Sequence, residues 1–160
     1  MLYPQLLEGD FDKLPRALRL FHSAPGGGSA SGTVTVRHVR SWLARLTGFP
    51  PSGEGIPLKL QVIASEGREI WIRDFGGAEL RTVQRREGDL MLETSGPVRL
   101  TFRLRADERG IRLHLLRARF WFVPIPLRIE AHAWGTDTSW EFEVIVAGVG
   151  SYRGTMVLTV

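Results

Sequence analysis

Apolar and polar residues alternate along most of the chain after residue 57, with the two-residue period of a β-strand. About nine short runs of this kind follow one another, separated by Gly, Pro and Asp. The pattern predicts a mainly β (α+β) fold, a curved antiparallel sheet or barrel of about 8–10 strands. No helical period follows Tyr152, so no C-terminal helix is expected. The last strand is expected to place Tyr152, Met156, Leu158 and Val160 on one face.

The first 50 residues have a helical period instead. Leu14, Ala17, Leu18 and Phe21 share one face of a predicted helix that contains Pro15 near its start. Asp10 or Asp12 is a candidate cap for this helix. The glycine-rich residues 25–32 are predicted to be a flexible loop, and residues 33–37 a short strand.

A second amphipathic helix is predicted from Val39, Trp42, Leu43 and Leu46, which recur at helical spacing before Gly48. The sequence therefore predicts one domain over residues 1–160. Its residues 1–50 form a part with 2–3 N-terminal helices and a short strand, and residues 57–160 form the antiparallel β region.

Side-chain faces predict the registers of two hairpins. Across a three-residue loop at residues 95–97, Glu93 is expected to face Arg99 on the polar side of the sheet. Across a loop at residues 135–138, Ala133 is expected to pair with Trp140 and Ala131 with Phe142. The second register gathers these polar and aromatic residues on the opposite face: Arg128, Glu130, His132, Trp134, Ser139, Glu141 and Glu143.

Five segments, in order across nearly the whole chain, carry a family resemblance. They are LYPQLLEGDFDKLPRALRLFH (residues 2–22), WIRDFGG (71–77), SGPVRL (95–100), FVPIPL (122–127) and YRG (152–154). The chain resembles a bacterial family known only as domain of unknown function 4166. Members also occur joined to dehydrogenase-like nucleotide-binding modules, which implies an accessory role beside an oxidoreductase. The resemblance provides no catalytic residues.

Composition and motif content exclude several chemistries. The chain has no Cys, which excludes disulfides and thiolate nucleophiles, and its four histidines lack metal-ligand spacing, so neither a metal nor a cofactor is expected. The net charge is +4, and Arg99, Arg103, Arg105 and Arg112 are expected to share a face. That face lacks interleaved aromatic residues, which makes nucleic acid an unlikely partner.

The termini and the amino-acid usage bear on location and origin. No apolar run is long enough to span a bilayer, and acidic residues interrupt the N-terminus where a signal peptide would lie, so a soluble cytoplasmic protein is predicted. Asn is absent and Gln occurs three times, which is a tendency of thermophilic proteins; a GC-rich genome is the alternative explanation for the composition.

Three functions remain open. The leading one is binding of a small apolar or amphipathic molecule in a β-lined pocket, with Arg73 or His22 at its mouth. Its candidate ligand-binding residues are His22, Trp71, Arg73, Phe122, Trp134 and Tyr152. No catalytic residue is assigned, because no catalytic motif is present.

Two alternatives belong to other classes. The first is a non-catalytic module that docks on a partner enzyme through a proline-aromatic run, which is Phe120-Trp121-Phe122-Val123-Pro124-Ile125-Pro126-Leu127. Its prolines cannot donate ladder hydrogen bonds, so the run is expected to leave the sheet or to follow an edge, as a core plug, a pocket lid or a docking surface for a partner or membrane. The second is an acid–base enzyme that uses Glu130, His132, Glu141 and Glu143. An outward salt-bridging face with Arg128 and Arg153 is the simpler interpretation of those four residues.

Overall fold

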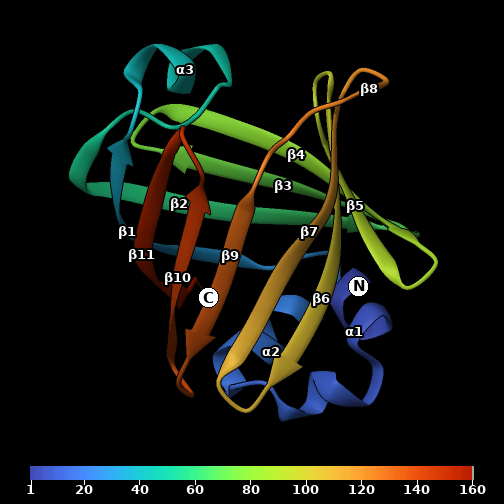
Figure 1. Ribbon diagram of the computed structural model, residues 1–160. Coiled ribbons are helices and arrows are strands. Elements are labelled where there is room, and N and C mark those ends of the chain that lie inside the picture. Colours follow the sequence, from blue (N-terminus) through green and yellow to red (C-terminus); the bar gives the residue numbers. More distant parts are fainter. Residues whose placement is uncertain (160) are drawn as a thin grey trace.

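The computed structural model describes residues 1–159 and shows a closed antiparallel β-barrel (Figure 1). Its strands are β1 (Ser29–His38), β2 (Gly53–Ser65), β3 (Arg68–Phe75), β4 (Ala78–Glu87), β5 (Leu90–Ser95), β6 (Val98–Asp107), β7 (Gly110–Phe120), β8 (Val123–Pro124), β9 (Ile129–Gly135), β10 (Ser139–Val146) and β11 (Gly150–Leu158). Ten strands close the barrel, because β6 pairs with β7, β7 with β9, and β11 with β1. The two-residue β8 pairs only with the end of β7. The predicted mainly β class is confirmed.

Four short helices lie outside the barrel wall. They are α1 (Leu2–Leu7), the 3-10 helix η1 (Glu8–Lys13), α2 (Arg16–Ser23) and α3 (Ser41–Leu46). Helices α1 and α2 lie at one end of the barrel, and α3 and β8 lie at the other (Figure 1). Within residues 1–159 no helix follows β11, as predicted. Val160, expected on the same face of the last strand as Tyr152, lies outside the described residues.

The predicted flexible loop at residues 25–32 is largely structured. Strand β1 begins at Ser29 and is ten residues long, so the predicted short strand at residues 33–37 lies in its C-terminal half. Gly27 has a φ of +124°, and a Cβ on it would lie 1.8 Å from the carbonyl oxygen of Val62. The amide of Val62 donates to the Gly28 carbonyl at 2.8 Å. The glycines therefore serve close backbone packing on β2 rather than flexibility.

In the β9–β10 hairpin the side chains lie on the predicted faces, but their cross-strand partners differ from the prediction. Phe142 pairs with Ala133 and Trp140 with Gly135, so the predicted register is wrong by two residues. The loop is shorter than expected, because Gly135 belongs to β9 and Ser139 begins β10. A shift of two residues leaves every side chain on its predicted face, since the strand period is two.

The β5–β6 hairpin departs from its prediction with a larger effect. Ser95 pairs with Val98, so the turn has two residues, Gly96 and Pro97, instead of three. Glu93 consequently pairs with Leu100 and not with Arg99. Because this is a shift of one residue, Glu93 moves from the predicted polar outer face to the inside of the barrel.

Helix α3 forms in the region predicted, but nothing described covers its apolar side. Trp42 is 64% exposed and Leu46 is 76% exposed, and Val39, just before the helix, is exposed as well. Only Ala44 is buried. Apolar residues at helical spacing normally form the side of a helix that packs on a core, whereas here most of that side is exposed.

Candidate functional site

The barrel encloses a cavity of about 770 Å³. Its wall is mostly apolar, because the inward positions of the strands carry Leu, Ile, Val, Phe and Trp. The lining extends from Tyr3, Leu18 and Phe21 at the α1–α2 end to Leu46 and Phe120 at the other. Leu46 and Phe120 also face solvent, so the cavity reaches the surface between α3 and β8. We call this end the mouth and the α1–α2 end the base.

Aromatic packing closes the base. The rings of Tyr3 and His22 are stacked with centroids 3.8 Å apart, and Phe21 contacts Trp71 edge-on at 5.8 Å and Trp140 at 5.1 Å. His22 is 5% exposed, and burial lowers its pKa to about 3. The imidazole is therefore neutral at pH 7, and it contributes ring packing instead of charge.

Glu69 ties the N-terminus to this base. One carboxylate oxygen, Oε1, accepts a hydrogen bond from the Leu2 amide at 2.6 Å, and Oε2 accepts one from the Trp71 indole N–H at 3.2 Å. The side chain is 1% exposed, and burial raises the pKa of its carboxyl group. Helix α1 is thus held against β3 by a buried polar contact as well as by apolar packing.

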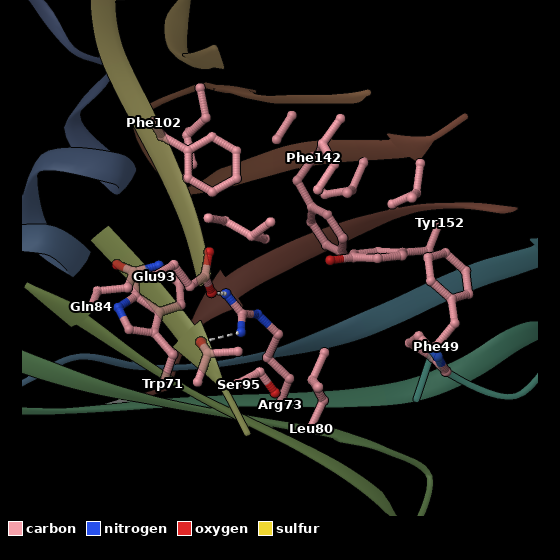
Figure 2. Close-up of a pocket in the computed structure, with 18 of the residues that line it drawn as sticks. Phe49, Trp71, Arg73, Leu80, Gln84, Glu93, Ser95, Phe102, Phe142 and Tyr152 are labelled. Atoms are coloured by element: carbon pink, nitrogen blue, oxygen red, sulfur yellow. Dashed lines mark hydrogen bonds and ion pairs between the residues drawn. The ribbon is translucent and has the colours of Figure 1, made fainter. Parts of the chain in front are cut away.

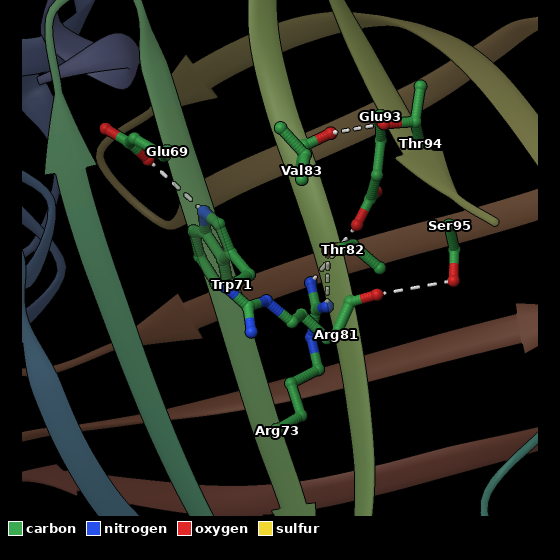
Figure 3. A network of polar contacts seen from close by, with 9 residues as sticks. All are labelled: Glu69, Trp71, Arg73, Arg81, Thr82, Val83, Glu93, Thr94 and Ser95. Carbon is green, nitrogen blue, oxygen red and sulfur yellow. Dashed lines mark hydrogen bonds and ion pairs between the residues drawn. The ribbon is translucent and has the colours of Figure 1, made fainter.

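A polar cluster lies on the cavity wall formed by β3, β4 and β5 (Figure 3). The Arg73 guanidinium donates through Nη1 to the Thr82 hydroxyl at 2.9 Å and approaches the Glu93 carboxylate through Nη2 at 3.4 Å. It also lies 5.0 Å from the ring centre of Trp71. The side chains of Arg73 and Glu93 are only 16% and 12% exposed. This pair is partly desolvated, and its two charges cancel within an otherwise apolar wall.

Tyr152 on β11 supplies a further polar group. Figure 2 shows its hydroxyl pointing into the cavity, toward the side on which Arg73 and Glu93 lie. Burial raises the pKa of the Tyr152 phenol, so it is protonated and neutral at pH 7. Its ring packs between Phe49, Phe75 and Phe142, at centroid distances of 5.6 to 6.0 Å. No side-chain hydrogen bond to this hydroxyl is found within residues 1–159, so it is available to a molecule in the cavity.

The structure brings four of the six candidate ligand-binding residues together. Trp71, Arg73 and Tyr152 line the central cavity, and His22 lines its base rather than its mouth. Phe122 is 82% exposed beyond the mouth. Trp134 lies on the outer face of β9, where the Arg153 guanidinium is 5.3 Å from its ring centre.

Sequence reasoning missed Glu93, Thr82 and Gln84, which also line the cavity. Glu93 was assigned to the outer face through the wrong turn length. A two-residue turn with glycine at its first position, as at Gly96, is a common hairpin connection and was the available signal. Thr82 and Gln84 lie two residues apart on β4, between the exposed Arg81 and Arg85, and this spacing was the signal for their shared inward direction.

The carboxylate face proposed for acid–base chemistry lies on the outside of the barrel. Arg153 donates through Nη2 to Glu141 at 2.9 Å. His132 pairs across strands with Glu143 and not with the predicted Glu141, and its ring contacts Trp134 at 4.8 Å. Burial lowers the pKa of His132, with nearby Arg112 as a second cause. The arrangement on this face is an ion pair between exposed side chains.

Between residues 1 and 159, no three His, Asp or Glu side chains come together in a way that could hold a metal ion. The helices described are all too short to cross a membrane.

Comparison of the chain with protein-family models, with curated proteins and with solved structures gave no match.

Proposed function

We propose that the protein binds a small amphipathic molecule inside the barrel. The observation that carries this proposal is the cavity of about 770 Å³ with its apolar wall. Ligand pockets in proteins commonly have volumes of roughly 300–1,000 Å³. Apolar surface removed from water there contributes about 25 cal/mol per Å², so a molecule that fills the space gains most of its affinity from burial.

The polar cluster defines the other end of the ligand. Arg73 is already paired with Glu93, so the cluster has no net charge, and Tyr152 adds a neutral hydroxyl. A carboxylate ligand placed here would lie beside the Glu93 carboxylate in a medium that screens poorly. An uncharged hydroxyl, carbonyl or amide can instead form hydrogen bonds with the donors Arg73 and Tyr152 or with the acceptor Glu93. We therefore favour a neutral, oxygen-bearing head group on an apolar body.

A neutral fluorescent probe, N-phenyl-1-naphthylamine, tests whether the cavity binds apolar molecules. Ala131 lines the cavity and its neighbour Glu130 points outward on the same strand, which provides a matched pair of substitutions. Ala131→Trp is expected to obstruct part of the cavity and weaken probe binding at least tenfold, whereas Glu130→Trp leaves probe binding unchanged. Equal binding by both variants, or no binding by the unmodified protein, contradicts the proposal.

The head group is tested separately with a long-chain alcohol and a fatty acid of equal chain length. A ligand that binds only the native state raises the melting temperature by mass action. The alcohol is expected to give the larger shift at equal concentration. A larger shift with the fatty acid contradicts the neutral head group but leaves the cavity proposal standing. The resemblance to family 4166 stays a prediction, and so does an accessory role beside an oxidoreductase.

A further inference from the structure

The mouth of the barrel is surrounded by exposed apolar side chains from two separate segments. One segment, residues 39–52, contains Val39 and the α3 residues Trp42 and Leu46. The other, residues 117–128, contains Trp121 and Phe122. We call these two segments the rim. They lie at the same end of the molecule (Figure 1), and both contribute residues to the cavity lining.

The second rim segment holds its aromatics at the tip of a tight hairpin. Phe120 pairs with Val123, so Trp121 and Phe122 form a two-residue turn that projects from β7. Trp121 has a φ of +57° and is 65% exposed, and its amide donates to the Pro97 carbonyl at 2.7 Å. A bulky residue in the left-handed region is strained, and exposure of its ring adds no packing in return. The folded state alone gives no reason for tryptophan here.

Charge on the rim has a single sign. Residues 39–52 contain Arg40 and Arg45, and residues 117–128 contain Arg117, Arg119 and Arg128. Neither segment contains an acidic residue. The α1–α2 end differs, because Glu8, Asp10 and Asp12 of η1 are balanced there by Lys13, Arg16 and Arg19. The molecule is therefore basic and aromatic on the rim where the cavity opens, whereas the helices at its base carry no net charge.

We infer that the rim docks on the surface of an anionic phospholipid bilayer, with the cavity mouth facing the lipid. Tryptophan side chains are enriched at the membrane interface, and arginines close to an anionic leaflet are attracted to its lipids. The aromatic tip and α3 enter the interface while the arginines contact the head groups. Docking itself stands on the rim alone; transfer of a ligand between bilayer and cavity rests additionally on the proposed function.

The rim composition favours lipid over single-stranded nucleic acid, which also attracts arginine and aromatic residues. Bases stack on aromatic rings, but the rim also exposes aliphatic Val39, Leu46 and Val123, which offer no ring to a base. An apolar interface accepts both kinds of side chain.

Vesicle co-sedimentation with the full chain tests this inference. Phosphatidylcholine vesicles are compared with vesicles that contain phosphatidylglycerol at a fraction of roughly one third, at two salt concentrations. The protein is expected to bind the anionic vesicles and to bind less as salt rises. The double variant Trp121→Ala/Phe122→Ala is expected to bind at least tenfold more weakly.

The matched control removes exposed apolar side chains elsewhere on the barrel wall. Ile63→Ala/Val157→Ala affects residues that are 42% and 47% exposed outside the rim, and it should bind vesicles like the unmodified protein. Thermal melting confirms that both double variants are folded. Ala131→Trp, which obstructs the cavity, should still dock, so failure of docking and failure of cavity binding are separate results.

Three outcomes overturn the inference. One is no binding of the unmodified protein to anionic vesicles at low salt. Another is unchanged vesicle binding by the double variant Trp121→Ala/Phe122→Ala. The third is that the unmodified protein binds a single-stranded oligonucleotide or a co-purified protein more tightly than it binds the vesicles, and that only Trp121→Ala/Phe122→Ala loses this binding. That result would assign the rim to that partner instead.

Discussion

Phe21 and Trp140 at the base of the barrel are buried against each other, whereas Trp121 and Phe122 at the mouth face solvent. Both ends are rich in aromatic residues, and the difference lies in what covers them. Helix α2 packs across the base, while α3 lies beside the mouth with its own apolar side uncovered. Aromatic residues therefore stabilise the fold at one end and are free to contact another surface at the other end.

Replacement of one phenylalanine at each end tests this contrast most strongly. Phe21→Ala removes a fully buried ring and is expected to lower the free energy of unfolding by about 3–5 kcal/mol. Phe122→Ala removes an exposed ring and is expected to change it by less than about 0.5 kcal/mol. Urea unfolding followed by circular dichroism measures both. Similar losses from the two variants would show that the mouth is packed in a way the exposures do not reveal.

Acid should loosen the base through His22. Its pKa in the folded protein is about 3, below the ordinary value of about 6.5, so the unfolded chain binds the proton first as the pH falls. The free energy of unfolding is expected to fall by about 1.4 kcal/mol for each pH unit below about 6.5, until the pH reaches the folded pKa.

His22→Phe keeps the ring stacked on Tyr3 and removes the proton site. The raised pKa of Glu69 acts in the opposite direction, because the folded state then takes up that proton first as the pH falls. The difference between the variant and the unmodified protein isolates the histidine. Unfolding is measured at pH 7.5, 6 and 5. The free energy of unfolding of the unmodified protein should fall relative to that of His22→Phe as the pH is lowered. Equal pH dependence of the two proteins would contradict a buried neutral His22.

A gain in stability, opposite in sign to the losses above, is expected at the hairpin tip. Trp121→Gly relieves a left-handed backbone conformation and is expected to raise the free energy of unfolding by about 1 kcal/mol. Phe122→Gly is the control, because its φ is not in the positive range and glycine there only adds freedom to the unfolded chain. The melting temperature should rise for the first variant and not for the second. A fall with Trp121→Gly would mean that the ring packs on the barrel.

Much of the barrel could be predicted from the two-residue alternation, because inward and outward positions are unchanged by a pairing error of two residues. The β9–β10 register was wrong by two residues, and Ala131, Ala133 and Phe142 still faced inward. At β5–β6 an error of one residue turned Glu93 to the wrong face and hid the partner of Arg73. Turn length is thus what limited prediction of the polar cluster.

The mouth was harder to predict for a different reason. A helical period shows that Trp42 and Leu46 share a side of α3, but it does not show whether another element covers that side. The proline-aromatic run is expected to leave the sheet or to follow an edge, and its single strained residue, Trp121, has no sequence signature. Candidate site residues placed by the strand period, such as Trp71 and Arg73, line the cavity; Phe122, placed from this irregular segment, does not.

The seam between β1 and β11 has a consequence for the order in which the chain folds. Ala30 pairs with Leu158, although most other strands pair with a neighbour along the chain. During synthesis β2 emerges soon after β1, but β11, which pairs with the other edge of β1, emerges only after all the strands between them. Nascent chains therefore carry open edges on β1 and β10 that invite pairing with other chains. Tyr152 lies on β11. A ribosome-bound fragment without β11 would therefore have neither a closed wall nor the tyrosine hydroxyl that adds to the polar cluster.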